Sequence, residues 1–315
     1  MKNELLTDRA FVERVFREAY EIGLSSASRG TVASYIPELK KADPKAFGMY
    51  MMTDDGYSLA FGDCLERFSI QSVCKVIILA ESLKLFGFKE TFSHVMMEPS
   101  GDSFNSILKL DLASSRPYNP MINAGAIELV SLLVNKVGYD ELLDETRALC
   151  MDPAIDLDES VYHSEFETGD RNRAIAYLLK SKGVLMGDPE KTLDLYFRMC
   201  SLSVNAKSLA GLGLVIANNG VDPFTGERLI KEEDVRTLKI IMFTCGMYDY
   251  SGKFDMNAGV PGKSGVGGGI VCAARGPMGI GFYGPALDAF GNSSGGVKAM
   301  VHISEKLRLH VFDYN

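Results

Sequence analysis

The segment from Phe68 to Gly87, FSIQSVCKVIILAESLKLFG, joins a reactive pair of residues to a strongly apolar helix. Its apolar residues recur at helical spacing, which predicts a buried helix over residues 72–86 that ends at Gly87. Ser72 and Lys75 are three residues apart where this helix begins. Residues at that spacing share one helix face, so a hydroxyl and an amine would lie side by side. Such a pair can act as a nucleophile and its base.

The flanking sequence changes its periodicity twice. Before the segment, residues 7–22 form an amphipathic pattern that predicts a helix ending at Gly23, and Asp55-Gly56 between two apolar runs predicts an antiparallel hairpin. After the segment, helical periodicity predicts helices over residues 121–136, 140–150, 170–182, 189–200, 205–218 and 232–245. Beyond Gly246, two short β-like runs, GGIVCAARG and MGIGFYG, precede a last helix near residues 295–308.

This order of elements predicts an α/β (α+β) fold. We expect residues 1–315 to form a single catalytic domain with two lobes. The expected sheet lobe, residues 1–68 and 248–315, is an antiparallel sheet flanked by the N- and C-terminal helices, and residues 69–247 are expected to form a large all-helical lobe. The chain has no repeat or Pro-rich linker that would separate the lobes. The seam between them is therefore the expected place for a small-molecule pocket.

Composition excludes several classes of function. Of the 315 residues, 46% are hydrophobic and 23% are charged, as in soluble globular enzymes. The net charge of -8 and the lack of a basic stripe argue against a nucleic-acid partner. The start of the chain carries acidic residues and no long apolar run, so we predict no signal peptide and no membrane partner. The expected location is cytoplasmic.

The cysteines and histidines give no support for a metal site. The four histidines have no close ligand spacing, and the cysteines form no C-x-x-C motif. We therefore predict neither a metal nor a cofactor. In this context the cysteines are expected to be reduced and buried. They are Cys64, Cys74, Cys150, Cys200, Cys245 and Cys272.

Three other motifs match catalytic patterns by spacing alone. A second S-x-x-K, Ser106–Lys109, lacks a strong apolar helix behind it. The run GNSSG at residues 291–295 lacks the buried strand that a nucleophile elbow requires, and we interpret it as a glycine-rich loop. The run GIGFYG at residues 279–284 opens no helix that could receive a pyrophosphate, so we interpret it as a strand. The context favours Ser72.

A third motif strengthens the Ser72–Lys75 pair. Residues 261–270 read PGKSGVGGGI, in which Lys263-Ser264-Gly265 resembles the K-T-G of penicillin-binding proteins and β-lactamases. Those serine acyltransferases also take their nucleophile from S-x-x-K. Their lysine triad lies on an edge strand that faces the S-x-x-K helix. The alternative interpretation is a basic turn before a strand.

The resemblance extends to one family within that superfamily. The chain contains, in this order, EPSG, NPMINAGAI, SE-x-x-x-GDRN, LYFRMCS, CGMYDYSG and PGKSGVGGG. These runs look like the serine-dependent glutaminase family, and the match extends from about residue 30 to the C-terminus. The S-D-N motif of β-lactamases is missing, which argues against lactam hydrolysis. The resemblance implies a β-lactamase-like fold and an amidohydrolase that converts L-glutamine to L-glutamate and ammonia.

Matching motif positions imply the roles of individual residues. The resemblance implies Ser72 as nucleophile and Lys75 as its partner, with Tyr248 and Lys263 also catalytic. The residues implied to contact glutamine are Ser72, Asn123, Glu165, Asn172, Tyr196, Tyr248 and Val266. Because glutamine is a zwitterion, Glu165 suits its α-ammonium group, and the two asparagines and Tyr196 suit its α-carboxylate. The implied partners are L-glutamine and further copies of the chain, as a dimer or tetramer.

The expected chemistry is a two-step acyl transfer. Ser72 attacks the side-chain carboxamide, ammonia leaves, and water hydrolyses the glutamyl ester. Lys75 can accept the Ser72 proton only if burial and a second cation, expected to be Lys263, lower its pKa from about 10.4. Tyr248 is the expected proton relay to ammonia. The backbone N–H groups of Ser72 and Val266 are the expected oxyanion donors.

Several alternatives stay open at this level. Tyr250 competes with Tyr248 as the relay, Glu167 competes with Glu165, and Asn123 would serve equally as a helix cap. A peptidoglycan-active or β-lactam-hydrolysing serine hydrolase would share the two lysines but should carry an export signal. A non-catalytic glutamine sensor would keep the binding residues without needing the Ser72–Lys75 pair.

Overall fold

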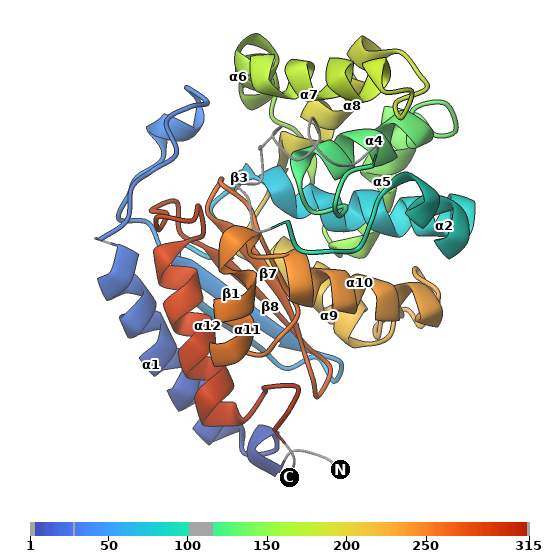
Figure 1. The fold of residues 1–315 in the computed structure, drawn as a ribbon. Coiled ribbons are helices and arrows are strands. Elements are labelled where there is room, and N and C mark those ends of the chain that lie inside the picture. The colour runs from blue at the N-terminus through green and yellow to red at the C-terminus, as the bar shows by residue number, and fades with distance from the viewer. Residues whose placement is uncertain (1–3, 28, 101–115, 314–315) are drawn as a thin grey trace.

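The computed structural model describes residues 4–27, 29–100 and 116–313. Figure 1 shows a twisted sheet with helices on both faces, next to a group composed of helices. The strands of the sheet pair antiparallel in the order β2-β1-β8-β7-β6. They are β1 (Gly48–Thr53), β2 (Ser58–Gly62), β6 (Gly262–Ser264), β7 (Gly269–Ala274) and β8 (Met278–Tyr283). The predicted antiparallel sheet is confirmed.

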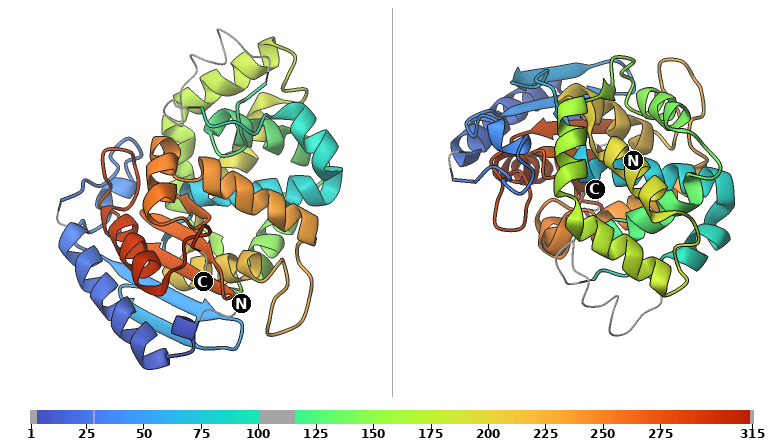
Figure 2. Two further views of the ribbon diagram at one scale, coloured as in Figure 1. Left: turned by 60° about the horizontal axis from the view of Figure 1, so that its bottom comes forward. Right: turned by 90° about the horizontal axis from the view of Figure 1, so that it is seen from above.

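The first and last long helices cover one face of this sheet. Helices α1 (Arg9–Ala27) and α12 (Ser294–Leu307) lie side by side, and α11 (Ser251–Asn257) packs against α12. The two turned views in Figure 2 show α1 and α12 on one side of the molecule. Phe16 and Met300 from these helices share a buried apolar cluster with Ile280 and Phe282 of β8. The expected flanking of the sheet by N- and C-terminal helices is therefore confirmed.

Helix α9 (Ala206–Ala217) lies directly on the other face of the sheet. Side chains alternate between the two faces of a strand, and Gly279 and Gly281 of β8 lie on the face that α9 covers. A Cβ atom at Gly279 would lie 1.9 Å from the carbonyl oxygen of Ala210, and one at Gly281 would lie 1.9 Å from that of Ala206. Only glycine at these positions lets the helix backbone approach the strand so closely.

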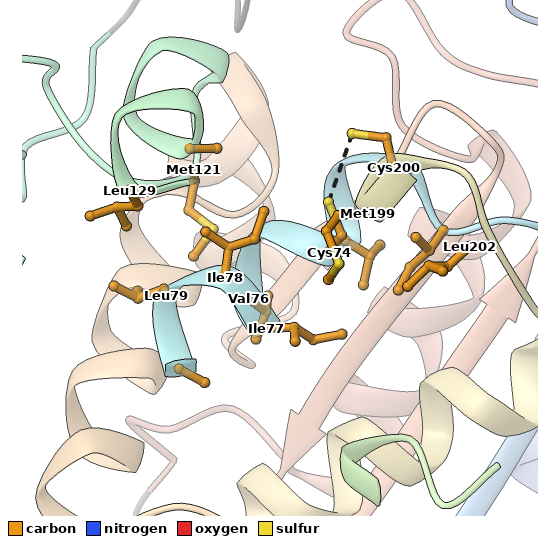
Figure 3. Packing of buried hydrophobic residues seen from close by; sticks show 14 of the residues in the cluster. Cys74, Val76, Ile77, Ile78, Leu79, Met121, Leu129, Met199, Cys200 and Leu202 are labelled. Carbon is orange, nitrogen blue, oxygen red and sulfur yellow. Dashed lines mark hydrogen bonds between the residues drawn. The ribbon is translucent and has the colours of Figure 1, made fainter. Parts of the chain in front are cut away.

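The remaining helices form the group seen at the upper right of Figure 1. They are α2 (Cys74–His94), α4 (Asn123–Leu133), α5 (Tyr139–Leu149), α6 (Glu159–Thr168), α7 (Asp170–Ser181), α8 (Pro189–Cys200) and α10 (Glu232–Cys245). Helix α2 is central, with Val76, Ile77 and Ile78 fully buried (Figure 3). A small sheet of order β3-β5-β4 supports its start, formed by β3 (Phe68–Ser69), β4 (Asp156–Leu157) and β5 (Leu202–Val204).

Several predicted boundaries and elements need correction. Helix α2 begins at Cys74, and Ser72 lies in the preceding 3-10 turn η3 (Gln71–Val73). Gly87, at φ 75°, kinks α2 but does not end it. Gly23 lies inside α1, where a Cβ atom would meet the Phe47 ring at 2.2 Å, so this glycine serves close packing.

The sequence pattern missed several short elements and gave one motif that the structure does not test. Helices α6 and α11 and the strands β3, β4 and β5 were not predicted. The hairpin at Asp55-Gly56 is confirmed, with Gly56 at φ 84° between β1 and β2. The second S-x-x-K motif, Ser106–Lys109, lies outside the described residues.

We propose to keep the two-lobe division of a single domain, with residues 1–68 and 248–315 as the sheet lobe. One buried cluster fills the space between the sheet and α1, α11 and α12. The other extends from α2 through the helical group to Val271 and Ala273, on the sheet face that α9 covers. The two lobes thus share an apolar interface. Among the described helices, none is long and apolar enough to cross a membrane.

The close approach of α9 to β8 predicts a test of the packing. We expect Gly279→Ala to lower the free energy of unfolding by about 1–3 kcal/mol, because the added Cβ overpacks against backbone atoms. In Gly252→Ala, the matched control, the new Cβ meets no heavy atom within 4 Å, so stability should stay within about 1 kcal/mol of the wild type. Urea denaturation measures both. Equal stability of Gly279→Ala and wild type would contradict this packing.

Candidate active site

The chain enters α2 through a strained turn that holds Ser72. Strand β3 pairs with β5, and the Ile70 N–H donates to the Leu202 carbonyl at 2.8 Å. Gln71 then adopts a left-handed conformation, with φ 49°. Such a conformation is uncommon for a residue other than glycine and occurs often at functional sites. It turns the chain so that Ser72, only 6% exposed, faces a cavity at the base of the helical group.

Five of the predicted substrate-binding residues line this cavity of about 70 Å³. They come from η3 and four helices, α4, α6, α7 and α8. These residues are Ser72, Asn123, Glu165, Asn172 and Tyr196. In the sequence they span more than a hundred positions, so the helical packing alone brings them together. Tyr35 and Ile36 line the same cavity from the N-terminal part of the chain.

Lys75 lies fully buried behind Asn123. Its Nζ donates to the Asn123 Oδ1 at 2.6 Å and to the Met121 carbonyl at 3.3 Å. Asn123 Nδ2 donates in turn to Asn172 Oδ1 at 2.9 Å. Burial lowers the pKa of Lys75 from 10.5 to about 8, although Cys200, Cys74 and Glu165 act in the opposite direction. Asn123 therefore joins a polar chain and does not cap its helix, contrary to the alternative considered above.

Glu165 is the buried acid of the cavity. It is 6% exposed, and its Oε1 accepts a hydrogen bond of 2.8 Å from Gln71 Nε2. Burial raises the pKa of Glu165 from 4.5 to about 7, against the lowering effects of Gln71 and Lys75. Glu167, the competing acid, is exposed to solvent. The geometry thus favours Glu165 as the acid of this cavity.

Tyr248 approaches Ser72 from the sheet lobe. Tyr248 also has a left-handed backbone, with φ 55°, and its hydroxyl lies close enough to Ser72 for the serine to act on its pKa. Burial raises the pKa of Tyr248 well above that of a free phenol. The competing Tyr250 instead stacks with Phe290, at 5.1 Å between ring centroids. Of the two tyrosines, Tyr248 is the one that faces Ser72.

Lys263 lies behind Tyr248 and does not line the cavity. As expected from the resemblance, it belongs to the edge strand β6. Its Nζ lies 4.4 Å from the Tyr248 ring centroid and donates to the carbonyls of Gly246 at 3.0 Å and Ser264 at 2.5 Å.

Burial dominates the electrostatics of both buried lysines. Burial, and secondarily Lys75, lower the pKa of Lys263 well below 10.5. Burial is also the largest cause of the low pKa of Lys75. Two buried amines that repel one another in this way do not both carry charge. The role of Lys263 as a second cation that acts on Lys75 stays a prediction.

Val266 lies in the turn after β6. Neither Val266 nor the residues next to it line the cavity. The side chain is 5% exposed and packs with Ile36, Leu39 and Leu287. The turn itself runs against η3, since a Cβ atom at Gly265 would lie 3.3 Å from the Ser72 nitrogen. Within the described part of the chain, the Val266 N–H donates to no other group. The turn that contains Val266 thus passes close to Ser72, at Gly265.

Seven of the described residues that line the cavity were missed at the sequence level: Tyr35, Ile36, Gln71, Thr168, Gly169, Arg171 and Cys200. Gln71 orients Glu165, Tyr35 covers the cavity from the segment before η2 (Leu39–Lys41), and Cys200 closes it at the end of α8. The signal for Gln71 was its position next to Ser72, but its residue type does not suggest a left-handed turn. Nothing in the local sequence places Tyr35 or Cys200 at this site. Among the described residues, no cluster of three or more His, Cys, Asp or Glu side chains could hold a metal ion.

Comparison with known proteins gives one consistent family. A family model described as Glutaminase matches residues 30–312. The curated Glutaminase 2 of Clostridium perfringens is 50% identical over 287 residues, which cover 90% of this chain and 94% of that protein. A glutaminase of Clostridioides difficile is 46% identical over 304 residues, covering 95% and 98%.

Solved structures agree with these sequences. A structure described as probable glutaminase ybaS has a TM-score of 0.92 and 34% identity, covering 98% of this chain and 100% of that one. The covalent complex of Bacillus subtilis glutaminase YbgJ with 5-oxo-L-norleucine has a TM-score of 0.85 and 33% identity, covering 95% and 99%. The β-lactamase-like fold and the sequence matches across nearly the whole chain lead to one conclusion: this chain belongs to the glutaminase family.

Proposed function

We propose that this glutaminase hydrolyses L-glutamine to L-glutamate and ammonia through a glutamyl ester on Ser72. The observation that carries the proposal is the position of Ser72, which shares a cavity with Glu165 and lies beside Tyr248. Lys75 lies buried three residues further along the chain. The cavity therefore offers an acid for the α-ammonium group at one end and a hydroxyl with a nearby base at the other.

The substrate would be held as a zwitterion. Glu165 accepts hydrogen bonds from the α-ammonium group, and Gln71 fixes the orientation of its carboxylate. Asn172 and Tyr196 donate to the α-carboxylate, together with Asn123, whose amide links Asn172 to Lys75. This arrangement orients the side-chain carboxamide towards Ser72.

Lys75 is the proposed proton acceptor. Its two hydrogen bonds, to Met121 and Asn123, can use both N–H groups of a neutral amine, which leaves the lone pair available. A pKa of about 8 keeps part of the enzyme in that neutral form near neutral pH. Tyr248, with its raised pKa, stays a phenol and is suited to donate a proton to the departing ammonia.

Two backbone groups and one buried amine complete the proposed site. The N–H groups of Ser72 and Val266 would stabilise the tetrahedral oxyanion, and each such donor contributes about 10²–10³-fold in rate. Lys263, although expected to be catalytic, is better described as a positioning residue. It contacts the Tyr248 ring and two carbonyls, so it would hold Tyr248 against Ser72.

The rival functions find less support. A β-lactamase or peptidase of this superfamily is disfavoured by the family matches and by the lack of S-D-N. A glutamine sensor would have no use for a fully buried lysine, whose desolvation is unfavourable. A cytoplasmic location is supported by free cysteines, buried throughout the described residues. The homo-oligomer, a dimer or tetramer, stays a prediction.

Replacing the nucleophile and the base should abolish turnover without unfolding the protein. We expect Ser72→Ala and Lys75→Met to lower kcat for ammonia release by at least about 10²-fold. Methionine fills the space of the lysine without a charge, so the variant should remain folded. Lys84→Met, a change of an exposed lysine on the same helix, is the control and should retain activity. Full activity in Ser72→Ala would refute the acyl-enzyme.

The acid of the cavity should control substrate binding. In Glu165→Gln the Gln71 contact is retained but the charge is lost, so we expect KM for glutamine to rise about 10- to 100-fold with a smaller change in kcat. Glu167→Gln changes the exposed acid two residues away and should leave KM within about twofold. Steady-state kinetics measure both. The opposite pattern would assign the ammonium site to Glu167.

The two perturbed groups also predict the pH profile. Glu165 must be charged, which requires a pH above its pKa of about 7, and Lys75 must be neutral, which requires a pH above about 8. Both conditions are met as pH rises, so kcat/KM should increase through this range. In Glu165→Gln the contribution near pH 7 should disappear. A wild-type kcat/KM that is constant across this range would exclude Lys75 as the base.

A further inference from the structure

Two thiols meet beside the cavity. Cys74 is the first residue of α2, two positions after Ser72, and Cys200 is the last residue of α8 and lines the cavity. Although 126 positions apart in the sequence, their sulfur atoms lie 3.8 Å apart, as Figure 3 shows. Among the described residues, this is the one pair of cysteine sulfurs in contact.

We propose that Cys74 and Cys200 form a disulfide when the enzyme meets hydrogen peroxide, and that this bond reversibly switches the glutaminase site off. The switching part of the proposal rests on the proposed function, whereas the formation of the bond does not. The site is a modification site for a small, uncharged peroxide.

The geometry requires only a short movement. A disulfide bond is about 2.05 Å long, so the two sulfurs must approach by less than about 2 Å from their present 3.8 Å. Both cysteines lie at helix ends, where side-chain rotation and a small backbone shift are easier than in the middle of a helix. The other cysteines are buried without a neighbouring thiol in the described residues, so cross-linking should be confined to this pair.

Peroxide would reach the two thiols through the substrate cavity, and a base close to this cavity would deprotonate them. Cys200 is 4% exposed and reaches the cavity, whereas Cys74 is fully buried behind it. Peroxide, which is little larger than water, would therefore meet Cys200 first. The thiol of Cys200 has a pKa well above its usual value, because of its hydrogen bond with Cys74 and its burial. It needs a base nearby, and Lys75 interacts electrostatically with both sulfurs.

The proposed reaction has two balanced steps. Lys75 takes the proton of Cys200, and the thiolate attacks one peroxide oxygen, which breaks the O–O bond to give a sulfenic acid and, after protonation, one water. The thiol of Cys74, also losing its proton, attacks the Cys200 sulfur. The S–S bond forms, the S–O bond breaks, and a second water leaves. Both sulfurs are oxidised, and the peroxide is reduced to two waters.

The disulfide should lower activity because both cysteines lie next to residues of the active site. Cys74 lies between Ser72 and Lys75, so moving its side chain towards α8 shifts the start of α2. Cys200 lies close enough to Tyr196 to raise the pKa of its hydroxyl, and this arrangement changes when the sulfur turns towards Cys74. A displacement of about an ångström at catalytic groups lowers rates strongly. We therefore expect at least a tenfold loss of turnover.

The test combines peptide mapping with activity. The purified enzyme is treated with hydrogen peroxide, free thiols are blocked, and the protein is digested and analysed by mass spectrometry. Ammonia release is measured before oxidation, after it, and after dithiothreitol. Dithiothreitol reverses a disulfide but not methionine sulfoxide, which separates the switch from general oxidation. Glutamate, added to fill the cavity, should slow the reaction.

Two variants make the result specific. Cys74→Ala removes one partner, and Cys272→Ala removes a buried cysteine of β7 as the matched control; each is compared with its own untreated rate. We expect a Cys74–Cys200 peptide and a reductant-reversible loss of activity in wild type and Cys272→Ala, and no reversible loss in Cys74→Ala.

Three outcomes would overturn the proposal. They are a reversible loss without the Cys74–Cys200 peptide, a complete disulfide with unchanged turnover, and the same reversible loss in Cys74→Ala. An untreated protein that released no ammonia would instead refute the proposed function, while the peptide map would still report on the bond.

Discussion

The burial of one amine organises this site. Lys75 lies in the apolar core of the helical group, in a helix whose next residues, Val76 to Leu79, are fully buried. Removing an ammonium group from water is unfavourable, so the neutral form is favoured and the pKa falls to about 8. The carbonyl of Met121 and the amide of Asn123 partly offset the desolvation. Burial thus makes Lys75 a base for Ser72, a role that histidine has in many other serine enzymes.

The elements around Lys75 form the substrate cavity next to this base. Helices α4, α6, α7 and α8 all contribute polar groups to the cavity, and Tyr248 approaches Ser72 from the sheet lobe. Left-handed backbones at Gln71 and Tyr248 lie on either side of Ser72. Strain of this kind is held in place by surrounding packing, here the two apolar clusters that lie on opposite faces of the sheet.

The sequence predicted elements correctly where neighbouring residues carry the signal. Periodicity located α8 and α10 with their observed bounds, and Asp55-Gly56 located the hairpin. It failed where tertiary contacts decide: α6 has too few apolar residues to show a face, and Gly23 continues a helix because a neighbouring ring needs the space. The site residues were found from ordered motifs. Two of their partners were harder to predict. Cys200, which contacts Cys74, comes from a distant segment, and Gln71, which hydrogen-bonds with Glu165, has an unusual φ.

The most direct measurement of the central claim is to trap the covalent intermediate. The enzyme is mixed with glutamine, quenched in acid after a few milliseconds, digested and analysed by mass spectrometry. The account predicts a glutamyl group on the peptide that contains Ser72, attached through the serine oxygen. A glutamyl group on another residue, such as the thiol of Cys200, or no adduct on a quench that captures turnover, would contradict it.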